Sequence, residues 1–214
     1  YYIYILTLLL FSCDDLLEHS GPLSYETLIL EGWAHFLDKD YEMAEELFGE
    51  VLEIDSSLVS YYSDALLGLG WTNLYHAKEL SGSSEEITNQ RFALRDSANI
   101  LLLLAYNEME SYTGSEEVPY NLMSDLYAGL SYATSSLVLH DNFIYGEDSD
   151  ELVYSALDYS DSLLSQTPDY YFLYDSININ SNNIHLLRAQ LYLEIHEYAE
   201  AEEEILQIDL ISSD

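Results

Sequence analysis

Apolar and polar residues alternate with a helical period along most of this chain. Residues 25–37 and 184–195 show this pattern clearly, with apolar side chains three or four positions apart. Helix-breaking residues are scarce, since the 214 residues include only three prolines and nine glycines. The pattern predicts an all-α protein.

A short sequence occurs twice, once near each end of the helical region. Residues 40–48 read DYEMAEELF and residues 197–205 read EYAEAEEEI, and a helical stretch precedes each copy. A small residue also stands twelve positions before an alanine in each: Gly32 before Ala44, and Ala189 before Ala201. Antiparallel helices joined by a short turn approach closely only where side chains are small. Each copy therefore predicts a tight helical hairpin.

These copies resemble the tetratricopeptide repeat (TPR), a helix–turn–helix unit, and two looser copies lie between them, around Trp71 and Tyr132. The resemblance implies TPR-like repeats over residues 25–58, 62–111, 121–168 and 182–214, stacked into a right-handed superhelix. The two middle repeats depart from the family pattern by inserts at about residues 79–90 and 140–151. An irregular helical bundle is the alternative.

In TPR arrays the first helices of the repeats line a concave groove. The resemblance implies five partner-groove candidates on these helices: Trp33, Asn73, Thr134, Gln190 and Glu194. Trp33 has packing as an equal alternative. Residues 170–174 (YYFLY) form a platform for sugar rings, an anchor for a partner, or a packed junction between the last two repeats. A ligand site would expose these rings together, whereas a scaffold would bury them.

The first residues suggest a location for the protein. Residues 1–12 are apolar and uncharged, too few to span a membrane, and are followed by Cys13, the one cysteine of the sequence. This segment resembles the lipobox of bacterial lipoproteins, which implies cleavage before Cys13 and lipidation of its thiol. We expect a signal peptide over residues 1–12, truncated at its start, a lipidated tether over residues 13–24, and an outer-membrane lipoprotein facing the periplasm or the cell surface.

The charge balance excludes some partners. The chain carries 40 acidic and 5 basic side chains, for a net charge of −35, which repels nucleic acid and anionic lipid. We therefore predict no nucleic-acid partner, and membrane contact through the lipid anchor alone. An acidic groove favours a protein partner with a basic segment, while adaptation to a saline habitat would explain the acidity equally well.

Motifs for chemistry are missing from the sequence. No two of the six histidines stand four positions apart, and there is no nucleophile elbow, phosphate loop or dinucleotide fingerprint. We therefore predict no catalytic residue, no metal and no cofactor.

The predicted function is a lipid-anchored TPR scaffold that binds another protein at the bacterial cell envelope. The alternative is a glycan-capturing surface lipoprotein, because residues 13–18 (CDDLLE) look like the start of SusD-type lipoproteins.

Overall fold

A computed structural model describes residues 24–54, 58–113, 121–145 and 149–211. Within these ranges the protein is all-α, as predicted, with an isolated β-bridge between Tyr171 and Asn180 as its one extended pairing. No helix in the described ranges is long and apolar enough to cross a membrane. Cys13 and the predicted tether lie outside these ranges. The helices are α2 (Tyr25–Leu37), α3 (Tyr41–Ile54), α4 (Val59–Glu79), α5 (Glu85–Ser111), α6 (Leu122–Tyr145), α7 (Ser149–Gln166), α8 (Ser181–Glu194) and α9 (Tyr198–Ile211).

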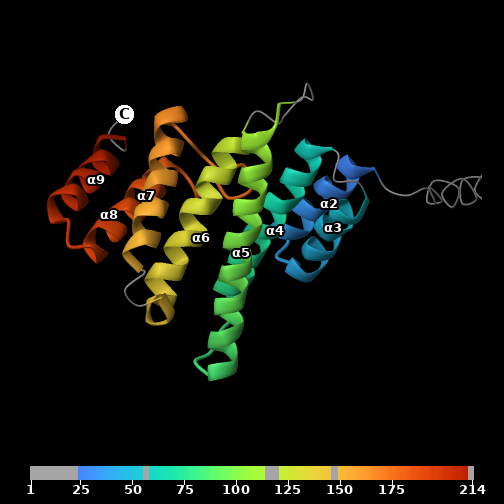
Figure 1. The fold of residues 1–214 in the computed structure, drawn as a ribbon, viewed down its shortest axis with the longest axis horizontal. Coiled ribbons are helices and arrows are strands. Elements are labelled where there is room, and N and C mark those ends of the chain that lie inside the picture. Colours follow the sequence, from blue (N-terminus) through green and yellow to red (C-terminus); the bar gives the residue numbers. More distant parts are fainter. Residues whose placement is uncertain (1–23, 55–57, 114–120, 146–148, 212–214) are drawn as a thin grey trace, which may run out of the picture.

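Consecutive helices form four pairs: α2 with α3, α4 with α5, α6 with α7, and α8 with α9. The pairs follow one another in a row from the blue to the red end of the molecule (Figure 1). The first helices of the pairs also touch one another, α2 on α4, α4 on α6 and α6 on α8. One side of the row is therefore built from first helices.

The first and last pairs share the same turn. Lys39 and His196 both adopt a left-handed conformation, with φ of 62° and 65°. In each turn the next amide reaches five residues back, from Asp40 to the His35 carbonyl and from Glu197 to the Tyr192 carbonyl, both at 2.9 Å. This is the usual way to satisfy the last carbonyls of a helix and to reverse the chain at once. The two sequence copies thus begin with equivalent turns.

A large side chain on the second helix fixes the spacing of the first helices. Phe48 of α3 packs against Gly32 on its own partner α2 and against Gly68 on the next first helix, α4. A Cβ atom at Gly32 would lie 2.8 Å from the Phe48 ring, and one at Gly68 only 2.4 Å. Only glycine therefore permits this contact on either side.

The second pair repeats the arrangement with leucine. Leu102 of α5 lies against Gly70 on α4 and Gly129 on α6, where Cβ atoms would approach it to 2.5 and 2.8 Å. In the third pair the corresponding position is Ser160, and the space is taken by Arg188 from α8, whose Nη1 donates to the Ser160 Oγ at 2.8 Å. At each of these junctions, a large side chain thus occupies the space that a small residue on the facing helix leaves open.

The predicted inserts are mostly helical, which corrects the sequence analysis. In the first of them, residues 79–90, α4 ends at Glu79 and α5 already begins at Glu85. Over residues 140–151, α6 continues to Tyr145 and α7 begins at Ser149. The Ser- and Glu-rich composition suits a helix start as well as a loop, and Ser84 caps α5 by accepting a hydrogen bond from the Ile87 amide. The extra residues lengthen the helices, and the α4–α5 pair projects beyond the row (Figure 1).

Candidate functional site

The five predicted groove residues do not share one surface. Trp33, Asn73 and Thr134 are at most 4% exposed, and the Thr134 hydroxyl is hydrogen-bonded to Asn99 of α5 at 2.9 Å. Gln190 and Glu194 are exposed on α8. Trp33 therefore packs, as one of its two interpretations allowed, and the first three cannot reach a partner in this conformation.

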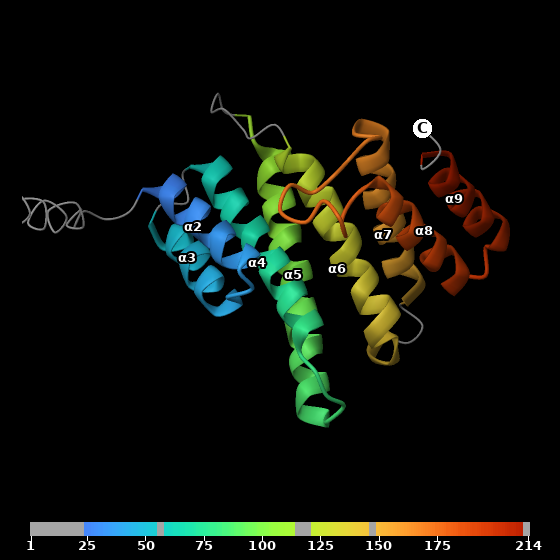
Figure 2. The ribbon, with the colours of Figure 1, turned by 180° about the vertical axis from the view of Figure 1, so that it is seen from behind.

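The first-helix side of the row is covered by the chain itself. The segment between α7 and α8, residues 167–180, is here called the connection. Figure 2 shows it leaving α7, crossing α6 towards α4, and returning to α8. Two hydrogen bonds of 2.9 Å close it into a narrow loop, from the Phe172 amide to the Ile179 carbonyl and from the Ser181 amide to the Tyr170 carbonyl.

Each of the first three first helices contributes one large ring beneath the connection. These are Trp33 on α2, Trp71 on α4 and Tyr132 on α6, and we call them the aromatic row. Phe172 stacks on Trp71 with ring centroids 4.6 Å apart, and Tyr174 stacks on Trp33 at 3.9 Å. The connection therefore occupies the place where an external ligand of the groove would lie.

Carboxylates of the first helices and of the connection accept hydrogen bonds from the tyrosines and the tryptophan at this contact. The Tyr170 hydroxyl donates to Asp125 of α6 at 2.7 Å, and the Tyr75 hydroxyl of α4 donates to Asp175 of the connection. Trp33 Nε1 donates to Asp64 of α4 at 3.4 Å. Tyrosine hydroxyls and an indole N–H buried in this way need such acceptors, since an unpaired polar group is costly to bury.

Two of these carboxyl groups have a pKa well above the ordinary value of an aspartate. Burial raises the pKa of Asp125 to about 7, against the lowering effect of the hydrogen bond from Tyr170, and the nearby charge of Asp64 adds to the rise. Burial likewise raises the pKa of Asp64 to about 6. Removing a carboxylate from water disfavours its charged form. We therefore expect the hydrogen bond between Tyr170 of the connection and Asp125 of α6 to respond to pH.

The outer side of the connection is apolar and open to solvent. Tyr171, Leu173 and Ile177 are 56%, 67% and 84% exposed. Phe172, which lies between Tyr171 and Leu173, is buried, and so is Ile179, so inward and outward side chains alternate over residues 170–173 but not beyond. Residues 170–174 stood out in the sequence as an aromatic cluster, but the exposure of Ile177 had no sequence signal.

Comparisons with known proteins add no relative. No family model, no curated protein and no solved structure matches this chain. The site is therefore interpreted from its own geometry.

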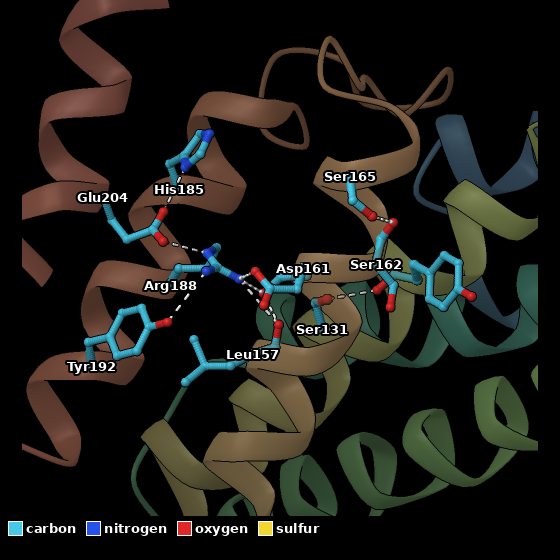
Figure 3. A network of polar contacts seen from close by, with 11 residues as sticks. Ser131, Leu157, Asp161, Ser162, Ser165, His185, Arg188, Tyr192 and Glu204 are labelled. Carbon is cyan, nitrogen blue, oxygen red and sulfur yellow. Dashed lines mark hydrogen bonds and ion pairs between the residues drawn. The ribbon is translucent and has the colours of Figure 1, made fainter. Parts of the chain in front are cut away.

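A second polar cluster joins the last two pairs (Figure 3). Arg188 of α8 is 6% exposed and lies 2.7 Å from both Asp161 of α7 and Glu204 of α9. His185 approaches the other oxygen of Glu204 at 2.6 Å, and Tyr192 lies 3.4 Å from the guanidinium. Every strong donor here faces an acceptor, so the cluster serves to join three helices.

Metal binding has no support in the part of the chain that is described. No group of three or more histidine, cysteine, aspartate or glutamate side chains is placed to hold an ion there. Residues 146–148 of the acidic stretch at residues 146–151 lie outside the described ranges. The buried carboxyl groups Asp64 and Asp125 instead contact rings of this chain.

Proposed function

We propose that this protein is a non-catalytic scaffold that binds another protein through the outer side of the connection. In this proposal the four helix pairs are TPR-like repeats in a right-handed superhelix. The shared turns at Lys39 and His196, and the recurrent fit of Phe48 and Leu102 between glycines, support a repeated unit.

The observation that carries the proposal is the exposed apolar face of Tyr171, Leu173 and Ile177. These side chains stand on a loop that Phe172 and Tyr174 anchor to the aromatic row. Large apolar side chains that are exposed close together along an anchored loop are typical of protein interfaces. Because the loop is held in place, binding a partner requires little further ordering of the chain, which favours affinity.

The charge of the molecule defines the partner further. With a net charge of −35, the protein attracts a surface whose apolar centre is surrounded by lysine and arginine. A basic partner segment gains speed of association from this field and an apolar contact from the connection.

Glycan capture is less well supported by the same loop. Tyr170 and Phe172 are buried, and Tyr174 is half-buried against Trp33. Tyr171 is therefore the one ring of residues 170–174 that is exposed, and a single ring does not form a platform for a chain of sugars.

The test compares two exposed isoleucines. Ile177→Gln removes an apolar side chain from the connection, and Ile100→Gln makes the same change on α5, where Ile100 is 58% exposed. Each variant is purified from native membranes after cross-linking, and the co-purified proteins are identified by mass spectrometry. We expect one stoichiometric partner with the wild type and Ile100→Gln, and its loss with Ile177→Gln. Equal capture by both variants contradicts the proposed surface.

We also propose that the protein is anchored to the outer membrane through lipid on Cys13. The support is the apolar segment of residues 1–12 that ends at this cysteine. Cys13→Ala is expected to move the protein from the membrane fraction to the soluble fraction, measured by immunoblotting after ultracentrifugation. A variant that stays with the membranes contradicts the anchor.

A further inference from the structure

A cavity of about 460 Å³ opens beside the connection, between α4, α5 and α6. Its walls come from the second half of α4, the first half of α5 and the second half of α6, and Asn178 and Ile179 of the connection close one side. The volume lies within the range of small-molecule sites. Tyr171, Leu173 and Ile177, the outer face proposed for the protein partner, do not line it.

The charged side chains that line this cavity are basic, whereas the molecule as a whole is strongly acidic. Lys78, Arg91 and Arg95 line it, which are three of the five basic side chains of the whole sequence. Among the described residues that line it there is no aspartate or glutamate, although the chain has 40 of them. In so acidic a protein, a cavity that gathers most of the cations and no carboxylate is prepared for a negative charge.

The three cations come from two neighbouring helices, α4 and α5. Arg91 and Arg95 stand one turn apart on α5 and so point from the same face of the helix. Lys78 comes from α4, with its Nζ 5.4 Å from the centre of the Tyr75 ring, and Arg91 donates to the Gly82 carbonyl at 2.7 Å. Within the described ranges, neither Lys78 nor Arg91 forms an ion pair. Neither cation has a direct carboxylate partner among the described residues, while the charge of Lys78 acts at longer range on Asp175 and Glu79.

The other wall of the cavity is apolar and aromatic. Trp71 and Tyr132 of the aromatic row line it, with Tyr75, Leu74 and Ile179. Trp71 and Tyr132 lie 5.8 Å apart, and the hydroxyl of Tyr132 reaches the Asn178 carbonyl at 3.5 Å, so this wall is held by the connection. Flat apolar groups pack well on such rings.

We propose that this cavity binds a small organic anion: a carboxylate, sulfonate or phosphate ester attached to a flat apolar body. Lys78, Arg91 and Arg95 bind the anionic group, and the wall of Trp71, Tyr75 and Tyr132 contacts the body. Binding here is separate from capture of the protein partner, because the two surfaces share no residue.

The test uses anilinonaphthalene sulfonate, an aromatic sulfonate, in calorimetric and fluorescence titrations of the purified protein at 0.15 M salt. We expect one saturable site per chain. Loss of a hydrogen bond to a charged group predicts about tenfold weaker binding for Lys78→Gln. The matched control is Lys39→Gln, which removes the same charge from a lysine that pairs with Glu79 and does not line the cavity. Its affinity should stay within about twofold of the wild type.

A second probe separates the sulfonate from the apolar body. Neutral N-phenyl-1-naphthylamine has the same rings without the sulfonate, and we expect it to bind at least about tenfold more weakly. Saturable binding that is weakened by Lys78→Gln and not by Lys39→Gln supports the site. No saturable binding, equal affinity in the two variants, or equal affinity for the neutral probe overturns it. Circular dichroism melting of each variant verifies that the fold is retained.

Discussion

Single glycines set the distance between helices in this molecule. Gly68 has the ring of Phe48 within 2.4 Å of the place of a Cβ atom, whereas a Cβ at Gly49 would meet nothing within 4 Å. These two glycines both lie inside helices, so they separate the effect of packing from that of helix propensity.

Gly68→Ala is expected to destabilise the protein by about 1–3 kcal/mol, because Phe48 must move to admit the new methyl group. Gly49→Ala is expected to stabilise it by about 0.5–1 kcal/mol through helix propensity alone. Urea denaturation of both variants provides the free energies of unfolding. If Gly68→Ala is stabilising to the same degree as Gly49→Ala, the close contact with Phe48 is wrong.

Asp125 gives the stability a pH dependence of known sign. Its pKa is raised on folding from 3.8 to about 7, so its favourable contribution is complete below pH 4 and is lost as the pH rises through 7. Asp125→Asn keeps an acceptor for Tyr170 without the charge. Its stability relative to the wild type should increase by about 2 kcal/mol between pH 5 and pH 8.

Urea denaturation at the two pH values measures this change. The control is Asp158→Asn, which removes the same charge from an exposed position on α7, where solvent screens it. A pH-independent difference between Asp125→Asn and the wild type would show that Asp125 is not buried under the connection.

Some of these residue-level features could be predicted from the sequence, and others could not. Gly32 and Ala44 stood out because a small residue on one helix and an alanine on the next recur at a fixed distance. The burial of Asn73 and Thr134 was not predictable in this way. Thr134, for example, is buried where its hydroxyl meets Asn99 of α5, 35 residues away in the sequence, and local periodicity does not report such a contact.

At the scale of elements, Arg188 joins the last two helix pairs. Its contacts with Asp161 and Glu204 link α7, α8 and α9, and it fills the space beside Ser160. The sequence resemblance assigned small residues to these junctions and gave no sign that an arginine would complete the third one. A lone basic residue in an acidic chain was the available signal.

Arg188→Ala is expected to destabilise the protein by about 3 kcal/mol, because the buried Glu204 loses its strongest cationic partner and keeps only His185. Lys39→Ala removes the exposed pair with Glu79 and should leave the melting temperature nearly unchanged. Thermal unfolding followed by circular dichroism compares the two. Similar small shifts for both variants would mean that the Arg188 cluster does not join the helices.

The connection is the element that the sequence described least well. Its rings were assigned to the junction of the last two repeats, to a sugar platform or to an anchor for a partner. In the structure, Tyr174 and Phe172 instead stack on Trp33 and Trp71, which belong to the first two helix pairs. Long-range placement of a loop depends on which complementary surface remains open, and that is known only once the helices are packed.

At the scale of the whole molecule, the side of the row that is formed by the first helices is covered by the connection, a segment of the same chain (Figure 2). The all-helical character of the described ranges was accessible from periodicity. What covers the first-helix side was not, because the connection reaches it from a distant part of the sequence. In the proposed function, the partner binds the outer side of the connection, and the cationic cavity lies beside the connection.

The account rests on a connection that is fixed against the aromatic row. Hydrogen exchange of single amides, followed by NMR, tests this most directly. The amides of Phe172 and Ile179 donate to backbone carbonyls at 2.9 Å, and both residues are at most 4% exposed. We predict that they exchange as slowly as the core amides of α4 and α6, near the rate set by global unfolding. Exchange at the rate of an open loop would contradict the account.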